Sequence, residues 1–217
     1  MKKELEEISE MMVARYSNRY KKLGYDMHTL GWGSKEQQEY RFRQTLSGIE
    51  FSADKTLIDI GCGFGDYFAF LAAEQLPVKK YYGWDINPDL IGEAAKIWEK
   101  NPAAAFSVVN ISTGQPVPAT ADIAIMLGLL NLNLQGKVDN YEYSSGLIKN
   151  AFACVSEVLV VDFLSAQLTP DYPQEDFIFY HEPARMLEFA LTLSPNVVLR
   201  HNYAPIPQKE FMLFIYK

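Results

Sequence analysis

The sequence predicts an α/β protein with a doubly wound, mostly parallel seven-stranded sheet, an antiparallel C-terminal strand and an N-terminal helical lid. Two observations predict this fold class. From Lys55 onward, short apolar runs alternate with helical stretches, whereas the first 50 residues show helical periodicity alone. Alternating strands and helices imply parallel strands joined by right-handed crossovers. We therefore divide the 217 residues into a helical extension, 1–50, and an α/β domain, 51–217.

The helical extension is predicted from its apolar spacing. Apolar and aromatic side chains recur every three or four residues over 5–23, which is one stripe of an amphipathic helix. Gly24 is a typical stop signal. After a glycine-rich break at 31–33, Ser34 is placed as the N-cap of a second helix that runs to about Ser47.

Seven apolar runs in the α/β domain are expected to be strands, and three stretches between them are expected to be helices. The strands are expected at Thr56–Ile60, Lys80–Asp85, Ala105–Asn110, Asp122–Leu127, Glu157–Asp162, Asn196–His201 and Phe211–Tyr216. The helices are expected near Gly65–Gln75, Pro88–Lys100 and Tyr141–Ala153. No helix separates the last two runs, so they should form an antiparallel hairpin at the edge of the sheet.

Composition and charge limit the partners of the protein. With 48% hydrophobic residues, no apolar stretch long enough to span a membrane, no signal peptide and two cysteines, the sequence predicts a soluble cytoplasmic protein. The net charge is −7, whereas proteins that bind a phosphate backbone usually present a basic face. The run of basic residues at 15–22 is either such a face or the solvated side of a helix. We favour the solvated side and expect neither a nucleic-acid nor a membrane partner.

A glycine-rich turn between a strand and a helix is the most informative segment. Residues 57–67 read Leu-Ile-Asp-Ile-Gly-Cys-Gly-Phe-Gly-Asp-Tyr, and the three glycines let a ligand approach the main chain. The N-terminus of the following helix offers free N–H groups. Twenty residues after Gly65, a second strand ends in Asp85, whose carboxylate can accept hydrogen bonds from a ribose diol. Open α/β sheets bind ligands at these carboxyl ends of adjacent strands.

This arrangement resembles the class I S-adenosylmethionine-dependent methyltransferases. Nicotinamide and flavin enzymes also pair a glycine turn with an acid, but their usual spacing is Gly-x-Gly-x-x-Gly, and here the third glycine comes one residue early. Asp59, an acid inside the strand before the turn, is also atypical of them. A glycine turn needed only for packing would leave both acids unexplained. The resemblance covers about residues 50–217 and implies a Rossmann-like methyltransferase domain.

The resemblance also implies a binding site for S-adenosylmethionine. Gly61, Gly63 and the backbone at Cys62 would hold the methionyl part of the cofactor, and Asp59 would orient the turn and the cofactor's amino group. Asp85 would bind the ribose hydroxyls. The Cys62 side chain is interpreted as a packing residue, because thiol catalysis needs a base nearby.

Further cofactor contacts are implied beyond the turn. Ile86 would pack on the adenine, and Asn110 and Ile111 would lie beside it, although Asn110 places a neutral amide where the family usually has a carboxylate. Leu127 would bring backbone carbonyls near the amino group and the sulfonium. Arg41 would grip a carboxylate, either the cofactor's or the acceptor's, or else is a surface residue.

The candidates for catalysis and acceptor binding are less specific. A general base is needed only for a protonated acceptor, and His181, just before a helix, is the candidate, with a structural hydrogen bond as the alternative. Helical extensions form lids over the cofactor in small-molecule members of the family, and Tyr16 and Tyr20 either serve such a lid or simply pack on the body. The connection Ser165–Glu182 is a second candidate lid. No metal ion is expected, and the candidate acceptor-binding residues are Tyr16, Tyr20, His28, Trp32, Gln38 and Tyr180.

The predicted function is methyl transfer to an oxygen or nitrogen atom of a small-molecule acceptor in secondary metabolism, by a monomer or homodimer. The alternatives are an RNA or protein methyltransferase, an NAD(P)-dependent oxidoreductase, and a cofactor-binding protein without catalysis. Methylation of a base nitrogen is disfavoured, because residues 127–131 read Leu-Gly-Leu-Leu-Asn where an Asn/Asp-Pro-Pro-aromatic signature would stand.

Overall fold

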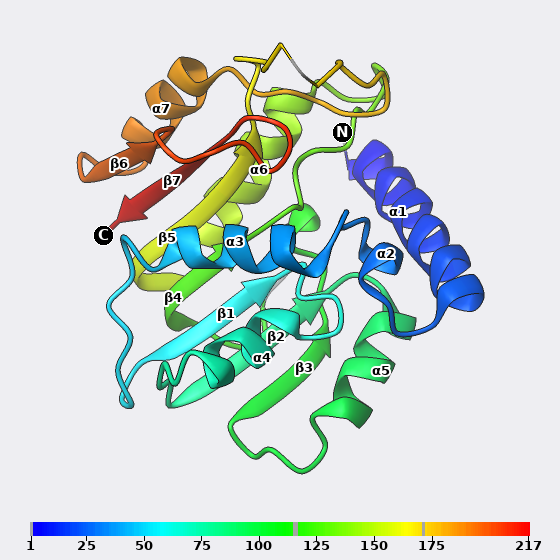
Figure 1. The fold of residues 1–217 in the computed structure, drawn as a ribbon, viewed down its shortest axis with the longest axis vertical. Coiled ribbons are helices and arrows are strands. Elements are labelled where there is room, and N and C mark those ends of the chain that lie inside the picture. The colour runs from blue at the N-terminus through cyan, green and yellow to red at the C-terminus, as the bar shows by residue number, and fades with distance from the viewer. Residues whose placement is uncertain (1, 115–116, 171) are drawn as a thin grey trace.

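The computed structural model describes residues 2–114, 117–170 and 172–217. In these residues α-helices cover a seven-stranded sheet (Figure 1). The strands are β1 (Thr56–Ile60), β2 (Lys80–Asp85), β3 (Ala104–Val108), β4 (Ala121–Met126), β5 (Val155–Leu164), β6 (Val197–Arg200) and β7 (Glu210–Tyr216). The α-helices are α1 (Lys2–Leu23), α2 (Met27–Leu30), α3 (Lys35–Thr45), α4 (Asp66–Ala73), α5 (Pro88–Ile97), α6 (Asn140–Phe152) and α7 (Pro183–Leu191), and a 3₁₀ helix, η1, spans Ile111–Thr113.

The strand order of the sheet is β3-β2-β1-β4-β5-β7-β6. The first five strands pair in parallel, whereas β7 pairs antiparallel with both β5 and β6. The predicted fold class and the terminal hairpin are therefore confirmed, and each predicted strand boundary lies within two residues of the observed one. The chain order reverses between β1 and β4, which is the switch point where open sheets of this type bind ligands.

Alternate side chains of the central strands enter two separate apolar cores. Leu57 packs in one core with Phe42 of α3, and Ile58 packs in the other with Ile148 of α6 and Met186 of α7. Helices thus cover both faces, which explains why these parallel strands read as continuous apolar runs. Within the described residues, no helix has the length and apolarity needed to cross a bilayer.

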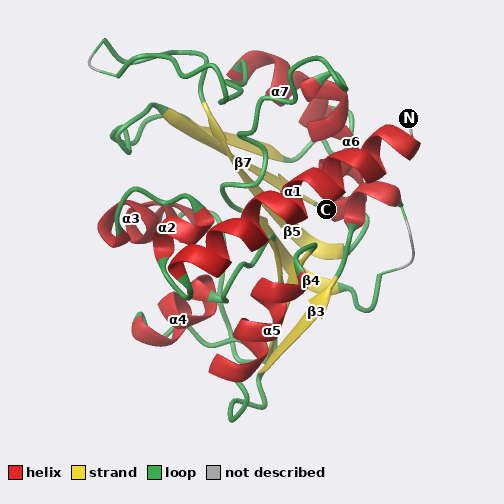
Figure 2. Cartoon of the chain, turned by 90° about the vertical axis from the view of Figure 1, so that its right-hand side faces the viewer, coloured by secondary structure: helices red, strands yellow, loops and turns green. Residues whose placement is uncertain are grey.

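Within the helical extension, α1 lies against the carboxyl ends of the parallel strands, whereas α3 packs on one face of the sheet. Figure 2 shows α1 running across this side of the molecule, and it contacts α2, α5 and η1. Ile8 and Met12 of α1 pack with Leu134, as the apolar stripe predicts. Ser34 caps α3 as predicted, by accepting a hydrogen bond from the backbone N–H of Gln37. The short helix α2 was not predicted from the sequence.

Candidate active site

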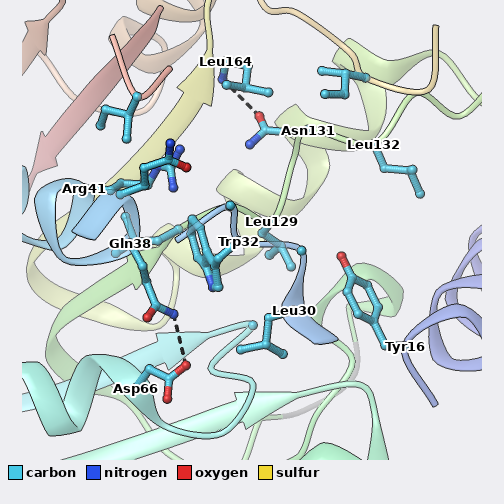
Figure 3. A pocket seen from close by; sticks show the side chains of 18 of the residues that line it. Tyr16, Leu30, Trp32, Gln38, Arg41, Asp66, Leu129, Asn131, Leu132 and Leu164 are labelled. Atoms are coloured by element: carbon cyan, nitrogen blue, oxygen red, sulfur yellow. Dashed lines mark hydrogen bonds between the residues drawn. The ribbon is translucent and has the colours of Figure 1, made fainter. Parts of the chain in front are cut away.

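A cavity of about 610 Å³ lies between the helical extension and the carboxyl ends of the strands (Figure 3). One end is lined by residues that end β1 and β2, together with α1, and we call it the β1–β2 end. The other end is lined from the segments 129–132, 172–178 and 206–208 and by Leu164, and we call it the β4–β5 end. Trp32 lies near the centre of the close-up in Figure 3.

The glycine-rich turn forms the floor of the β1–β2 end. Gly61 has a φ of +81° and Gly63 a φ of +55°, which are left-handed conformations that favour glycine. A Cβ added at Gly61 would lie 2.8 Å from Leu129, and one added at Gly63 would lie 2.7 Å from Leu30. Both leucines line the cavity. Because Gly61 and Gly63 carry no side chains, Leu129 and Leu30 can pack directly on the backbone of the turn.

Asp85 presents a fixed carboxylate at the end of β2. It accepts hydrogen bonds from the backbone N–H groups of Gly63 (3.1 Å) and Asn87 (2.8 Å), one on each oxygen. It also lines the cavity, and burial raises its pKa. Each carboxylate oxygen keeps a lone pair for a further donor, so Asp85 is arranged to accept two hydrogen bonds from a ligand.

Two more carboxylates line the β1–β2 end. Asp59 accepts a hydrogen bond from the hydroxyl of Tyr81 at 2.5 Å, and burial raises the pKa of Asp59 to about 7. Asp66 accepts a hydrogen bond from Gln38 Nε2 at 3.0 Å (Figure 3), and burial raises its pKa as well. Asp85 and Asp66 both raise the pKa of Asp59 further by charge repulsion. This concentration of buried carboxylates favours a ligand that carries positive charge.

A sequence comparison identifies this region of the chain. Residues 51–152 match a family model described as "Methyltransferase domain". Residues 51–152 therefore carry a methyltransferase domain. The matched residues include β1, the glycine-rich turn and Asp85, which contribute to the lining of the β1–β2 end of the cavity. The cofactor, S-adenosylmethionine, carries a sulfonium and an ammonium group that suit its carboxylates.

Solved structures share the methyltransferase fold at low sequence identity. Magnesium protoporphyrin IX methyltransferase from Synechocystis PCC 6803, solved with S-adenosylmethionine, is 12% identical with a TM-score of 0.66, over 99% of this chain and 97% of that one. The N-methyltransferase NodS from Bradyrhizobium japonicum WM9 is 13% identical with a TM-score of 0.58, over 94% and 98%. An rRNA methylase from Streptococcus thermophilus is 13% identical with a TM-score of 0.51, over 83% and 93%. A comparison with curated protein sequences gave no significant match.

The structure brings most of the predicted cofactor-binding residues of the methyltransferase together. The cavity is lined by Asp59, Gly61, Cys62, Asp85, Ile86, Leu127 and Arg41, whereas Gly63, Asn110 and Ile111 are not among its lining residues. The Cys62 thiol is buried, which raises its pKa, and its sulfur would lie 2.9 Å from a Cβ added at Gly83. This close contact fits the packing role predicted for its side chain.

Asn110 is engaged elsewhere. Its Oδ1 accepts hydrogen bonds from the backbone N–H and the hydroxyl of Ser112, which makes it the N-cap of η1. Its Nδ2 donates to the hydroxyl of Ser9 at 2.9 Å. The amide that the family resemblance assigned to the adenine therefore ties α1 to the end of β3.

Arg41 forms a buried ion cluster instead of lying at the surface. Its Nε and Nη2 donate to Glu210, and Nε also lies 3.1 Å from Asp162, whose Oδ2 accepts no hydrogen bond from the described residues. The guanidinium stacks over the ring of Trp32, 4.6 Å from its centroid. Burial raises the pKa of both carboxylates, that of Glu210 to about 7. One cation thus faces two acids, and the structure records no hydrogen bond from Arg41 Nη1 within the described residues.

The predicted acceptor-binding residues divide into two groups. Tyr16, Trp32 and Gln38 line the cavity, whereas Tyr20, His28 and Tyr180 do not. Tyr20 donates to Glu93 at 2.8 Å and packs against Phe64, and His28 pairs with Asp26 at 2.6 Å. Trp32 packs so closely on Gly128 that a Cβ added there would lie 2.9 Å from its ring. Trp32 therefore packs beside Gly128, two residues after the end of β4.

The structure places the predicted catalytic histidine outside the cavity. His181 is fully buried, its Nε2 lies 2.9 Å from the hydroxyl of Ser144, and Phe163 and Phe179 pack against its ring. Burial lowers its pKa to about 3. A neutral ring in an apolar box, without contact to the cavity, matches the structural alternative and not the position of a general base. The sequence placed His181 correctly after β5 but could not show which way its ring points.

Sequence reasoning missed several polar residues of the site. Asp162 and Glu210 were not singled out, although an acid within an apolar strand is a signal of buried pairing. Asn131 and Gln208 also line the cavity, but nothing local in the sequence marks them. The segment 165–182 was singled out, and its Glu175 lines the cavity, whereas Asp171 of the same segment lies outside the described residues.

Proposed function

We propose that the enzyme transfers a methyl group from S-adenosylmethionine to an oxygen or nitrogen atom of a small-molecule acceptor. One observation carries the proposal: a continuous cavity joins the β1–β2 end, which fits the cofactor, to the mostly apolar β4–β5 end. Its volume of about 610 Å³ falls within the range of about 300 to 1,000 Å³ that is common for small-molecule sites. We further propose a role in secondary metabolism, a cytoplasmic location, and a monomeric or homodimeric state.

In this proposal the β1–β2 end orients the cofactor. Asp85 accepts hydrogen bonds from the two ribose hydroxyls, and the backbone at Gly61, Cys62 and Gly63 supports the methionyl part of the cofactor. Asp59 faces the positively charged amino group of the cofactor and attracts it electrostatically when ionised. Because positive charge near Asp59 favours its ionised form, cofactor binding should lower a pKa that burial raises to about 7.

The adenine side is closed by α1. Ile86 packs with Ile8 and Met12 of α1 in one apolar cluster, and Ile86 and Met12 both line the cavity. Asn110 supports this contact, because its Nδ2 donates a hydrogen bond to Ser9 of α1. The proposed lid, residues 1–50, would thus exclude water from the adenine and keep the cofactor in place.

S-adenosylmethionine supplies an activated methyl group to an in-line displacement. The residues of this chain provide alignment and exclude water. Leu127 lines the cavity, Trp32 packs on Gly128, and Arg41 lies over Trp32, so the central wall is held from both sides. The structure records no hydrogen bond from Arg41 Nη1 within the described residues, and in this proposal Nη1 donates to the carboxylate of the cofactor. The proposed mechanism uses no proton transfer by His181.

An RNA or protein methyltransferase is the main alternative, since an rRNA methylase shares the fold. The basic run at 15–22 does not favour this alternative, because Arg15 and Arg19 of the run line the cavity from α1. Arg15 is also exposed to solvent. A nucleic acid needs an extended basic surface more than a narrow cavity.

Two measurements test the proposal. Calorimetric titration with S-adenosylhomocysteine should show binding to the purified protein, and NADH should show none. Incubation with S-adenosylmethionine labelled in the methyl group, with a panel of small-molecule acceptors and with total RNA, should place the label on a small molecule. Label found in RNA or protein would replace the proposal with its alternative.

A further inference from the structure

The β4–β5 end of the cavity has a definite chemistry. Most of its described lining residues are apolar, among them Leu132, Leu164, Ile178 and Ile206. Phe177 lines the mouth of the cavity while 48% of its surface stays exposed, so a large ring is available to a bound molecule. These walls suit an acceptor with a flat or elongated apolar body.

Glu175 is the one carboxylate among the described lining residues of this end, where Lys, Arg and His are absent. The side chain is held by two donors: the Tyr172 hydroxyl lies 3.3 Å and Gln208 Nε2 3.5 Å from Oε1. Its backbone N–H donates to the Tyr180 hydroxyl at 3.1 Å, and Gln208 Nε2 donates to the same hydroxyl at 2.8 Å. Both polar contacts of the side chain use Oε1, and the structure records none for Oε2 within the described residues. The carboxylate is therefore positioned with one oxygen available.

The segment that carries Glu175 is also fastened by its backbone. Leu132 and Ile178 form an antiparallel bridge, Asn133 N donates to Phe177 O at 2.9 Å, and Phe179 N donates to Asn131 O at 3.0 Å. The segment after β5 thus pairs with the segment after β4. Glu175 belongs to a built wall of the cavity and not to a free loop.

The surrounding charges favour a positive partner for Glu175. A carboxylate only accepts hydrogen bonds, so a ligand must bring the donor. Arg41 lines the cavity between the two ends, but its charge is shared by Asp162 and Glu210, so this cluster offers no excess positive charge. Arg15 and Arg19 belong to α1 at the opposite, β1–β2 end. An anionic acceptor would therefore meet uncompensated negative charge at the β4–β5 end.

We infer that the acceptor carries an ammonium group on an apolar body, and that Glu175, held by Tyr172 and Gln208, is the residue that selects it. This inference rests on the proposed function, since it names the acceptor class of the same cavity. Glu175 acts here as the counter-ion that anchors the acceptor, while the cofactor remains at the other end.

The test compares three probes that share an indole and a two-carbon arm: tryptamine, which is cationic, tryptophol, which is neutral, and indole-3-propionate, which is anionic. Their affinities are measured by calorimetry or by NMR titration, with and without S-adenosylhomocysteine. We expect the affinity of tryptamine to be about ten-fold higher than that of either other probe, or higher still, because its ammonium forms a charge-assisted hydrogen bond with Glu175. Equal affinities, no binding of tryptamine, or a preference for the anion would overturn the inference.

Two variants assign the preference to one side chain. Glu175→Gln keeps the shape and removes the charge, so the preference for tryptamine should disappear while affinity for S-adenosylhomocysteine stays unchanged. Glu182→Gln makes the same change in the same connection, at an exposed residue outside the cavity lining, and should keep the preference. A preference retained in Glu175→Gln would contradict the inference. Failure to bind S-adenosylhomocysteine would instead contradict the proposed function, and the probe titrations without it would still report on Glu175.

Discussion

The two ends of the cavity are built in different ways. The three carboxylates of the β1–β2 end come from two continuous strand-to-turn segments, 57–67 and 82–87, and the backbone N–H groups of Gly63 and Asn87 in these segments hold Asp85. The β4–β5 end comes from three segments far apart in the sequence, and its Glu175 is held by Gln208 across 33 positions. In the proposed function, cofactor recognition is therefore encoded in short segments of the sequence, whereas acceptor recognition is assembled by the tertiary fold and can change one segment at a time.

The largest expected effect is at the β1–β2 end. Asp85→Ala should weaken binding of S-adenosylhomocysteine by about 100-fold or more, because two hydrogen bonds to a charged acceptor are each worth about 1.5–3 kcal/mol. Calorimetric titration measures this change. Asp89→Ala, which removes an exposed carboxylate in the first turn of α5, is the matched control and should bind normally. Unchanged affinity in Asp85→Ala would remove the basis for assigning the cofactor to this end.

The second effect concerns the ion cluster that supports the middle of the cavity. Arg41→Met keeps the volume of the side chain but leaves Asp162 and Glu210 buried without a cation, which should lower the free energy of unfolding by about 3–5 kcal/mol. Urea denaturation measures the loss, which should shrink at pH 5 as the carboxylates become protonated. Arg43→Met is the control, because Arg43 lies in the same helix with 49% of its side chain exposed. Equal stability of the two variants would show that the cluster contributes little.

The fold and the β1–β2 end were predicted from the sequence because both depend on short-range patterns. Apolar runs such as 56–60 mark strands, and the glycine turn followed by Asp85 marks a ligand site, since parallel strands bring their carboxyl ends to one edge. The terminal hairpin was also predicted, because no helix separates its strands. The short helix α2 was not, since four residues carry no periodicity.

The rest of the site could not be predicted, because it depends on contacts between distant segments. Nothing near Arg41 shows that Glu210, 169 positions away, binds its guanidinium. The sequence placed His181 on the correct connection, but its ring turns into the core towards Ser144. Asn110 follows β3 as predicted, yet α1 folds back and Ser9 takes its amide. In each case the position along the chain was predicted correctly and the partner was not.

A third effect is the dependence of stability on pH that Asp59 gives to the β1–β2 end. Burial raises the pKa of Asp59 from 3.8 to about 7, so between about pH 4 and 7 the folded state holds a proton that the unfolded state has lost. Stability should therefore be highest below pH 4 for this group and fall as pH rises to about 7, by at most about 1.4 kcal/mol per pH unit. Asp59→Asn should reduce this slope in urea denaturation between pH 4.5 and 7.5. Asp54→Asn, at an exposed residue, should not. Glu210, whose pKa is also raised to about 7, should keep part of the slope in the variant.

The smallest expected effect tests whether α1 or the adenine uses Asn110. Asn110→Ala removes the cap of η1 and the hydrogen bond to Ser9, and the cap alone is worth about 0.5–2 kcal/mol. Because Asn110 does not line the cavity, affinity for S-adenosylhomocysteine should fall by less than about ten-fold, far less than in Asp85→Ala. Hydrogen exchange in α1 should become faster.

Ser9→Ala is the matched variant, because it breaks the same hydrogen bond from the other side and leaves the cap of η1 intact. If Asn110 serves mainly to hold α1, both variants should speed exchange in α1 similarly, and addition of S-adenosylhomocysteine should slow it again in both. A large loss of affinity in Asn110→Ala without one in Ser9→Ala would instead show that the amide leaves Ser9 and binds the adenine. The position of Asn110 directly after β3 in the sequence would then predict cofactor recognition better than its hydrogen bond to Ser9 in the structure does.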